Sequence, residues 1–256
     1  MWYSHRPSQL LLFTNKLDKD VQRILKPFNI ILTIFFSSKF KIRNGYITPC
    51  DKKLHIILFI CVIFLNAWSV YEMRVYISGK ASIIINSQII FSFLLIICFF
   101  TYFILIFSNI AYCQSNILLI YTIQDIHRAM RNSSSFKNYI TWNWITILIC
   151  ICFDILIMSS YCMLLSKIHI FSVSTLYLNM ASEINVFYCI RVLAFLIMSL
   201  EEWIENVLVV KSDDYCEEYC GKLFKVYQDI IKAHKLLQNC FRLLVRSLIF
   251  ILIKIF

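Results

Sequence analysis

The chain contains very few of the residues that form turns, and its charge is low for its size. Three of its 256 residues are glycine, three are proline, and 16% are charged. All-β proteins and transmembrane barrels need turn residues between their many strands, so this shortage argues against both. Soluble domains carry about 25% charged residues, and the lower fraction here argues against a soluble protein as well.

Motifs of the common enzyme classes are also missing from the sequence. It contains no P-loop, HExxH or GxSxG motif, and no cluster of histidine and cysteine with metal-ligand spacing. Cys216 and Cys220 share a helix face, but no pair of histidines lies near them. We therefore predict that the chain is not an enzyme and uses neither a metal nor another cofactor.

Hydrophobic residues make up 60% of the chain, and the mean hydropathy is +0.72. They form long runs of isoleucine, leucine and phenylalanine, which a soluble core of this size could not bury. In lipid, only a helix or a closed barrel satisfies its own backbone hydrogen bonds. The shortage of turn residues argues against the barrel. The sequence therefore predicts an all-α integral membrane protein in the lipid bilayer of a cell membrane.

Four apolar segments approach or exceed the roughly 20 residues that a helix needs to cross a bilayer. They cover residues 54–70, 83–107, 140–165 and 172–200. The fourth is longer than required, so we expect it to tilt or to extend into the cytosol. The final apolar run, residues 243–256, is too short to span comfortably and predicts a partial fifth helix.

Lysine and arginine set the expected orientation. The first 53 residues hold ten of them, and the connections after the second and fourth segments are richer in them than those after the first and third. This pattern predicts a cytoplasmic N-terminus and explains the net charge of +10 without a nucleic-acid partner. We divide the chain into a cytoplasmic N-terminal segment (1–53), a four-span domain (54–200), a cytoplasmic helical segment (201–242) and a truncated fifth span (243–256).

The N-terminal segment contains an amphipathic stretch at residues 15–25. Its apolar residues recur at helical spacing, and Pro27 is expected to end the helix. Residues 28–36 are too short to cross a bilayer, so we expect them to lie at the membrane interface. Lys39 and the basic residues after it are expected to mark the return to water.

Two further segments, residues 114–130 and 213–239, have one apolar and one polar face. Because both are expected on the same side of the membrane, they are natural packing partners. The alternative is that the second of them lies alone on the membrane surface.

Charged side chains inside a span are costly, and each is a functional candidate for that reason. Asp154 lies in the third span, and Glu183 and Arg191 lie in the fourth. Glu183 and Arg191 are eight residues apart, about 12 Å along a helix, which is too far for a direct pair. We predict an intramembrane charge pair between Asp154 and Arg191 across two helices.

The segment before the first span carries a family resemblance. It reads Lys26-Pro27-Phe28-Asn29 and then Lys39-Phe40-Lys41-Ile42-Arg43-Asn44-Gly45-Tyr46-Ile47-Thr48-Pro49. It resembles the N-terminal region of insect gustatory receptors, particularly those of moths and butterflies, and the layout of the spans agrees over nearly the whole chain. The resemblance implies a subunit of a homo- or heterotetrameric ligand-gated cation channel that detects small-molecule tastants.

The signature of that family is Thr-Tyr followed by an apolar run that ends in Gln-Phe. It lies in a seventh span that lines the pore. In this chain Thr101-Tyr102 matches only the start of the signature, and it falls in the second span. By the resemblance, we expect a C-terminally truncated receptor without the pore-lining helix.

In the family, ligands enter a pocket among the outer halves of several spans. Placed by position, the resemblance assigns seven candidate ligand-binding residues to this chain: Asn86, Gln88, Asp154, Tyr161, Asn179, Glu183 and Tyr188. Such a pocket would combine aromatic walls with a few polar groups. Tyrosine and asparagine near a membrane boundary are also ordinary interfacial anchors, which is the alternative role for these residues.

Two other protein classes share some of these features. A non-channel multi-pass protein, such as a transporter component or a scaffold, would have the same apolar spans. Transporters favour spans broken by glycine or proline, and the three glycines of this chain lie outside its spans. A fragment of a G-protein-coupled receptor would have an outward N-terminus, which the distribution of basic residues disfavours.

Overall fold

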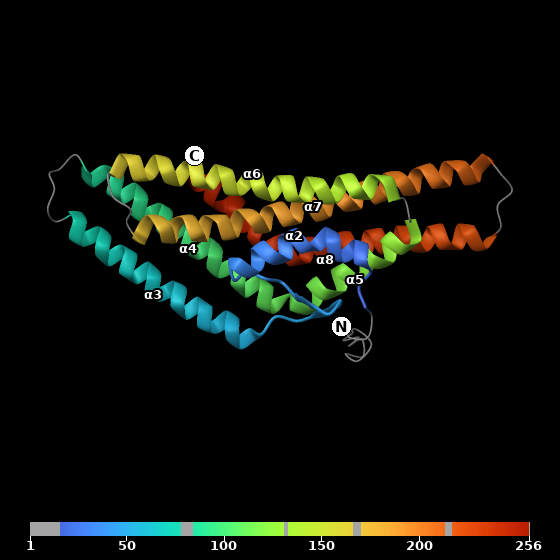
Figure 1. The fold of residues 1–256 in the computed structure, drawn as a ribbon, viewed down its shortest axis with the longest axis horizontal. Coiled ribbons are helices and arrows are strands. Elements are labelled where there is room, and N and C mark those ends of the chain that lie inside the picture. Colours follow the sequence, from blue (N-terminus) through green and yellow to red (C-terminus); the bar gives the residue numbers. More distant parts are fainter. Residues whose placement is uncertain (1–15, 78–83, 131–132, 166–169, 213–216, 256) are drawn as a thin grey trace.

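The computed structural model describes residues 16–77, 84–130, 133–165, 170–212 and 217–255, which form seven helices and one two-stranded hairpin (Figure 1). The elements in chain order are α2 (Lys19–Ile34), β1 (Lys41–Arg43), β2 (Tyr46–Thr48), α3 (Lys52–Ile77), α4 (Ile84–Ala111), α5 (Cys113–Met130), α6 (Ser133–Leu165), α7 (Ile170–Ser212) and α8 (Glu217–Ile255). The helices lie mostly along one long axis, and α4 turns into α5 at a sharp bend (Figure 1).

Within these residues, α3, α6 and α7 are long and apolar enough to cross a membrane. The pair formed by α4 and α5 is bent by 70° and would be a fourth crossing if the two helices count as one broken span. The predicted helical fold, with several helices able to span a membrane, is confirmed at this level. The count of four spans, the cytoplasmic N-terminus and the domain divisions stay predictions.

The predicted helix at the N-terminal end is real, but the expected stop at Pro27 is wrong. α2 runs through Pro27 to Ile34, because its apolar face continues and is buried against the other helices. Proline removes one backbone donor from the helix interior. The carbonyl of Ile24, one turn earlier, accepts a hydrogen bond of 3.1 Å from Nδ2 of Asn143 on α6. The burial of the apolar face of α2 on both sides of Pro27 offsets the cost of the proline.

The chain reverses after α2 and forms the hairpin. Phe36 ends the helix with a φ of 52°, and the two strands pair antiparallel with Ile42 opposite Ile47. Asn44 and Gly45 have φ values of 54° and 83°, the left-handed geometry of a two-residue hairpin turn for which Asn-Gly is the preferred sequence. The backbone N–H of Leu17 donates to the carbonyl of Gly45 at 2.8 Å, which ties the hairpin to the start of α2.

The expectation that Lys39 returns the chain to water is wrong. Its side chain is 3% exposed and lies inside the molecule between the hairpin, α4, α7 and α8. Residues 37–40, which precede β1, lie inside the molecule together, because Ser37, Ser38 and Phe40 beside Lys39 are also buried.

The two amphipathic segments after the second and fourth spans pack on each other. α5 and α8 share the most extensive contact between any two elements of the described chain. The apolar stripe of α8 is buried there, including Val226, Ile230, Ala233 and Leu237. The alternative of a lone surface helix is therefore wrong. α8 also continues without a break into residues 243–255, which were expected to start a separate helix.

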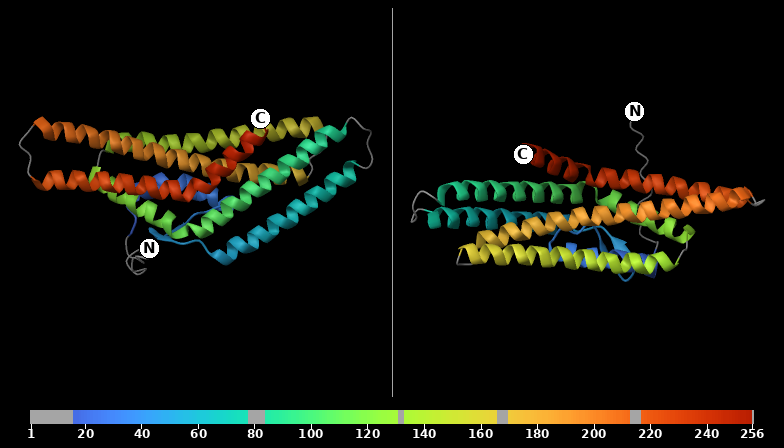
Figure 2. Two further views of the ribbon diagram at one scale, coloured as in Figure 1. Left: turned by 180° about the vertical axis from the view of Figure 1, so that it is seen from behind. Right: turned by 90° about the horizontal axis from the view of Figure 1, so that it is seen from above.

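The molecule has two halves along its long axis (Figure 2). In the packed half, α2, the hairpin, α5 and α8 surround the adjoining parts of α6 and α7, and they bury most of their apolar side chains. In the other half, which we call the splayed half, α3 and the first part of α4 run at an angle to the end of α6 and the start of α7 (Figure 1). Large apolar side chains such as Phe64 and Leu156 are exposed there.

Candidate functional site

An apolar cavity of about 340 Å³ lies between α3 and α7 in the splayed half. This volume is at the lower end of the range of 300–1,000 Å³ that is usual for small-molecule sites. The wall from α3 and the wall from α7 face each other, and Phe36 after α2 closes one side. The lining residues are Phe36, Leu58, Cys61, Val62, Leu65, Asn66, Val173, Ser174, Tyr177 and Leu178.

The cavity exists because α3 meets the other helices along one narrow line. Among the described side chains of α3, only His55, Val62 and Ser69 are buried, and they are spaced by seven residues. Seven residues are close to two turns, so all three lie on one face. Ser69 is the polar anchor of this line, because its Oγ lies 2.8 Å from Oγ of Ser174 on α7.

Asn66 is one of the few polar residues that line the cavity. Its Nδ2 donates to the carbonyl of Val62 at 2.8 Å, within its own helix. Its Oδ1 is buried and has no hydrogen-bond partner among the described residues. The surface that the cavity presents to a ligand is therefore apolar. The site can bind a small, mostly apolar molecule.

The residues predicted for ligand binding do not lie together. The side chains of Asn86, Gln88 and Tyr161 are outside those that the structure describes, although α4 and α6 pass through these positions. Asn179 donates a short hydrogen bond to Glu183, and the charge of Glu183 acts on Asp154 across the contact of α6 with α7. Asp154, Asn179 and Glu183 are not among the residues that line the cavity.

Tyr188 was assigned to an outer pocket by the resemblance, and this assignment is wrong. The side chain is 1% exposed and lies in the packed half, where its ring makes an edge contact with Phe28 at a centroid distance of 5.6 Å. The ring of Phe241 on α8 lies 6.0 Å from it on another side. Tyr188 belongs to the core because α2 and α8 cover this part of α7.

The predicted charge pair between Asp154 and Arg191 is also wrong. Nε of Arg191 donates to Oδ1 of Asn143 at 2.7 Å, and its Nη2 donates to the carbonyl of Tyr139 at 3.4 Å. Both carboxylate oxygens of Asp154 are buried without a hydrogen-bond partner among the described residues. Asn143 and Asp154 are eleven residues apart on α6, about 16 Å, so Arg191 cannot bond both.

Lys39 is the centre of a buried polar network in the packed half. Its Nζ donates to Oδ1 of Asn109 at 2.8 Å, and Nδ2 of Asn109 donates to the carbonyl of Ser37 at 2.8 Å. The ammonium also lies 4.4 Å from the centroid of the Phe241 ring. No carboxylate of the described chain forms an ion pair with it. Burial lowers the pKa of Lys39 to about 8.

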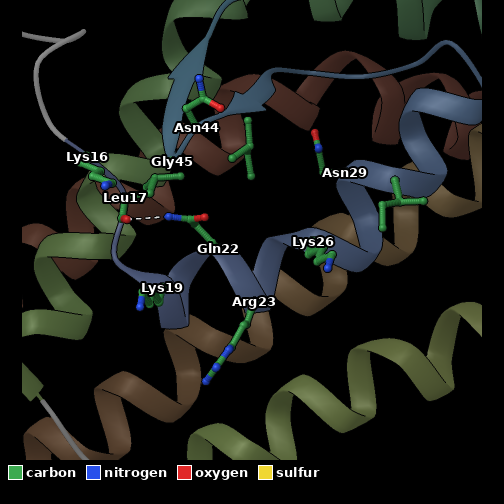
Figure 3. A pocket seen from close by; sticks show the side chains of 11 residues that line it. Lys16, Leu17, Lys19, Gln22, Arg23, Lys26, Asn29, Asn44 and Gly45 are labelled. Atoms are coloured by element: carbon green, nitrogen blue, oxygen red, sulfur yellow. Dashed lines mark hydrogen bonds between the residues drawn. The ribbon is translucent and has the colours of Figure 1, made fainter.

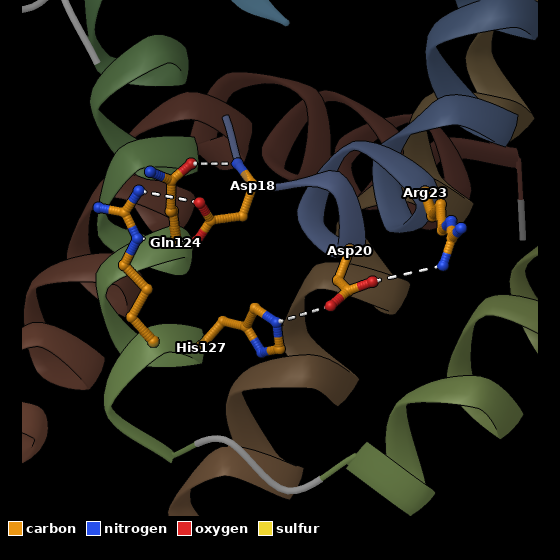
Figure 4. A network of polar contacts seen from close by, with 6 residues as sticks. Asp18, Asp20, Arg23, Gln124 and His127 are labelled. Atoms are coloured by element: carbon orange, nitrogen blue, oxygen red, sulfur yellow. Dashed lines mark hydrogen bonds and ion pairs between the residues drawn. The ribbon is translucent and has the colours of Figure 1, made fainter. Parts of the chain in front are cut away.

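A second polar network joins the start of α2 to α5 (Figure 4). Arg128 donates to both carboxylate oxygens of Asp18, at 2.7 and 2.9 Å, and the backbone N–H of Asp18 donates to Oε1 of Gln124 at 3.2 Å. The hydrogen bonds from Arg128 hold the pKa of Asp18 below its usual value. Asp20 lies 4.0 Å from His127 and 3.5 Å from Arg23. These contacts fix the N-terminal segment on the packed half.

Sequence reasoning missed the cavity and the polar residues of α3 at the contact with α7. Asn66 and Ser69 are three residues apart in the first apolar run, and so they share one helix face. This spacing predicts a polar line along that span, although it does not identify the partner helix.

Among the described residues, no group of three or more His, Cys, Asp or Glu side chains is placed to hold a metal ion. The chain matches no protein-family model and no curated protein.

Proposed function

We propose that this chain is a chemoreceptor subunit that resembles insect gustatory receptors. In this proposal it lies in the cell membrane with its N-terminus in the cytoplasm and forms part of a homo- or heterotetrameric ligand-gated cation channel. The observation that supports it best is the apolar cavity between α3 and α7. The ligand is a small, mostly apolar molecule.

The helix arrangement gives such a ligand a way to act on the rest of the subunit. α3 is held to α7 along one line of side chains, so a ligand in the cavity acts directly on the spacing of these two helices. α7 is continuous from the cavity to its contact with α8, where Nε1 of Trp203 donates to the carbonyl of Leu223 at 2.8 Å. A ligand can shift the equilibrium between two spacings of α3 and α7 only by the difference between its affinities for them.

Two exposed cysteines allow a matched test of binding. Cys61 lines the cavity, whereas Cys152 is exposed on α6 and is not a lining residue. Candidate tastants are added to membranes containing the chain, and both thiols are then labelled with a membrane-permeant maleimide. We expect a true ligand to slow labelling of Cys61 and to leave labelling of Cys152 unchanged. Equal labelling rates with and without every compound would contradict the assignment of the cavity.

The channel part of the proposal needs a separate measurement. In cells that express the chain with its partner subunits, we expect ligand-evoked cation currents to be lost in Cys61→Trp, because the indole fills the cavity. Cys152→Trp adds the same bulk elsewhere and should keep the currents. Protection of Cys61 without any current would instead support the non-channel alternative.

A further inference from the structure

A second, open pocket of about 660 Å³ lies between α2 and the hairpin (Figure 3). Its lining includes Lys16, Lys19, Arg23 and Lys26, and no carboxylate is among the described residues that line it. The amides of Gln22, Asn29 and Asn44 add further donors. This composition fits an anion with several acceptor oxygens, and lysine and arginine are the usual partners of phosphate.

The hairpin turn forms the floor of the pocket and gives it shape. Nε2 of Gln22 donates to the carbonyl of Leu17 at 2.7 Å, and the backbone of Leu17 is bonded to Gly45. A Cβ on Gly45 would lie 3.1 Å from Nε2 of Gln22 and 3.1 Å from Cε of Lys16, so both side chains pack against the turn. The stem of Lys16 thus lies beside Gly45 (Figure 3).

The lysines of the pocket are not neutralised by neighbouring acids. Asp18 is held by both donors of Arg128, and Asp20 is in contact with Arg23 and His127 (Figure 4). Within the described chain, no carboxylate forms an ion pair with Lys16, Lys19 or Lys26. Three exposed positive charges thus surround one pocket, which favours a multiply charged anion over chloride or a single carboxylate.

The exposed face of α2 changes from basic to apolar at this pocket. Ile30 lines it, and Ile30 and Ile34 are 38% and 57% exposed. Lys26 and Ile34 are eight residues apart, about 12 Å along the helix. A charged rim followed by an exposed apolar strip matches a molecule with a phosphate headgroup and an acyl chain.

We propose that this pocket binds a phosphate-bearing anion presented by a membrane lipid. The headgroup phosphates lie among Lys16, Lys19 and Lys26, and an acyl chain lies over Ile30 and Ile34. Clusters of lysine at a membrane surface attract acidic lipids by about 1 kcal/mol for each residue. A soluble inositol phosphate carries the same phosphate chemistry without the acyl chain. The site does not depend on the tastant cavity or on channel activity.

The test uses the full chain purified in neutral detergent and a fluorescent short-chain phosphatidylinositol bisphosphate as the probe. The triple variant Lys16→Gln, Lys19→Gln, Lys26→Gln is compared with Lys225→Gln, Lys232→Gln, Lys235→Gln, which removes equal charge from exposed positions of α8. We expect the pocket variant to lose at least about tenfold in affinity and the α8 variant less than about twofold. Equal losses in the two variants, or no loss in the pocket variant, overturn the proposal.

Competition then separates the two sources of phosphate. We expect unlabelled short-chain lipid to displace the probe at lower concentration than soluble inositol trisphosphate, and Ile30→Asn, Ile34→Asn to remove this advantage. All these positions are exposed, so the variants should keep the thermal stability of the wild-type chain. If inositol trisphosphate competes as well as the lipid, the lipid part of the proposal is overturned.

Discussion

α2 and α3 follow each other in the sequence, but they bury their side chains in opposite ways. α2 has 16 residues, and six of them are buried in a broad apolar face: Val21, Ile24, Leu25, Pro27, Phe28 and Leu32. α3 has 26 residues, and among its described side chains only His55, Val62 and Ser69 are buried. Both helices are rich in apolar residues, so the difference lies in their arrangement.

The comparison shows which surroundings each half of the molecule requires. The apolar residues of α2 recur with the helical period, so a protein core covers them and water meets the opposite face. Those of α3 cover the whole circumference, and Phe64 is 71% exposed. A helix of this kind is stable only where the solvent is itself apolar. The packed half folds by burial within the protein, and the splayed half requires apolar surroundings outside the chain.

The largest predicted effect contrasts two phenylalanines from the two halves. Phe28 is 2% exposed, and Phe28→Ala should lower the free energy of unfolding by about 3–5 kcal/mol through the cavity that it leaves. Phe153 on α6 is 59% exposed, and Phe153→Ala should change it by less than about 0.5 kcal/mol, because lipid or detergent replaces the ring. Unfolding monitored by tryptophan fluorescence in detergent measures both. Similar losses would remove the distinction between the halves.

The next prediction concerns the contact of α6 with α7, which runs through both halves. Arg191→Gln should destabilise the chain by about 2 kcal/mol, because it weakens the charged hydrogen bond and leaves Oδ1 of Asn143 buried. Asp154→Asn should not destabilise it, because its carboxylate has no partner among the described residues. In the double variant the two effects should add, since the side chains do not pair. A coupling energy above about 1 kcal/mol would restore the charge pair that the sequence suggested.

Lys39 allows the interior of the packed half to be tested by pH. Its pKa is lowered by burial to about 8, so the unfolded chain holds more protons than the folded chain between about pH 8 and the usual value of 10.5. Stability should therefore rise with pH in this window, by about 2 kcal/mol from pH 8 to 9.5, relative to Lys39→Met. Thiols of Cys50, Cys189 and Cys240 face the same ammonium, and the difference between wild type and variant removes their common contribution.

The smallest predicted effect is at the surface of the packed half. Asp18→Asn breaks the pair with Arg128, and both side chains are more than a third exposed, so the loss should stay below about 1 kcal/mol. The pKa of Asp18 is lowered in the folded chain. Its contribution is therefore present above about pH 3.8 and is lost as the pH falls through the folded value.

A matched control for this pair lies on α8. Glu218 and Lys222 form an ion pair of 2.6 Å that is exposed on both sides. Glu218→Gln should cause no measurable change in stability, because solvent screens this pair. If Glu218→Gln and Asp18→Asn lower the free energy of unfolding equally, the ion pair between α2 and α5 stabilises the chain no more than an exposed ion pair within one helix.

Several of these features could be predicted from the sequence, and the errors have identifiable causes. The stripe from Leu17 to Phe28 and the faces of residues 114–130 and 213–239 follow the helical period, and the structure buries them. The stop at Pro27 was wrong because the apolar face of α2 continues to Leu32 and is buried against helices far away in the sequence. Lys39 was placed in water because its side-chain partner, Asn109, is seventy residues distant.

The candidate site was less accessible to sequence reasoning than the fold. Charge inside a span identified Asp154, Glu183 and Arg191 as notable, but it could not say that Arg191 bonds Asn143. The cavity requires a gap between α3 and α7, and the size of a gap depends on side chains of two helices that are a hundred residues apart in the sequence. The turn at Asn44 and Gly45, in contrast, could have been predicted locally, because Asn-Gly is the preferred sequence of a two-residue hairpin turn.

Composition and periodicity alone determined that this protein is helical, that several of its helices are apolar enough to cross a membrane, and where the amphipathic helices lie. These properties depend on residues close together in the chain, because backbone hydrogen bonds and helix faces are local. Only the tertiary structure decided which buried polar groups are partners, which lysines are covered, and where a cavity and a basic pocket are left open. Those outcomes depend on distances between segments far apart in the sequence, which no local pattern specifies.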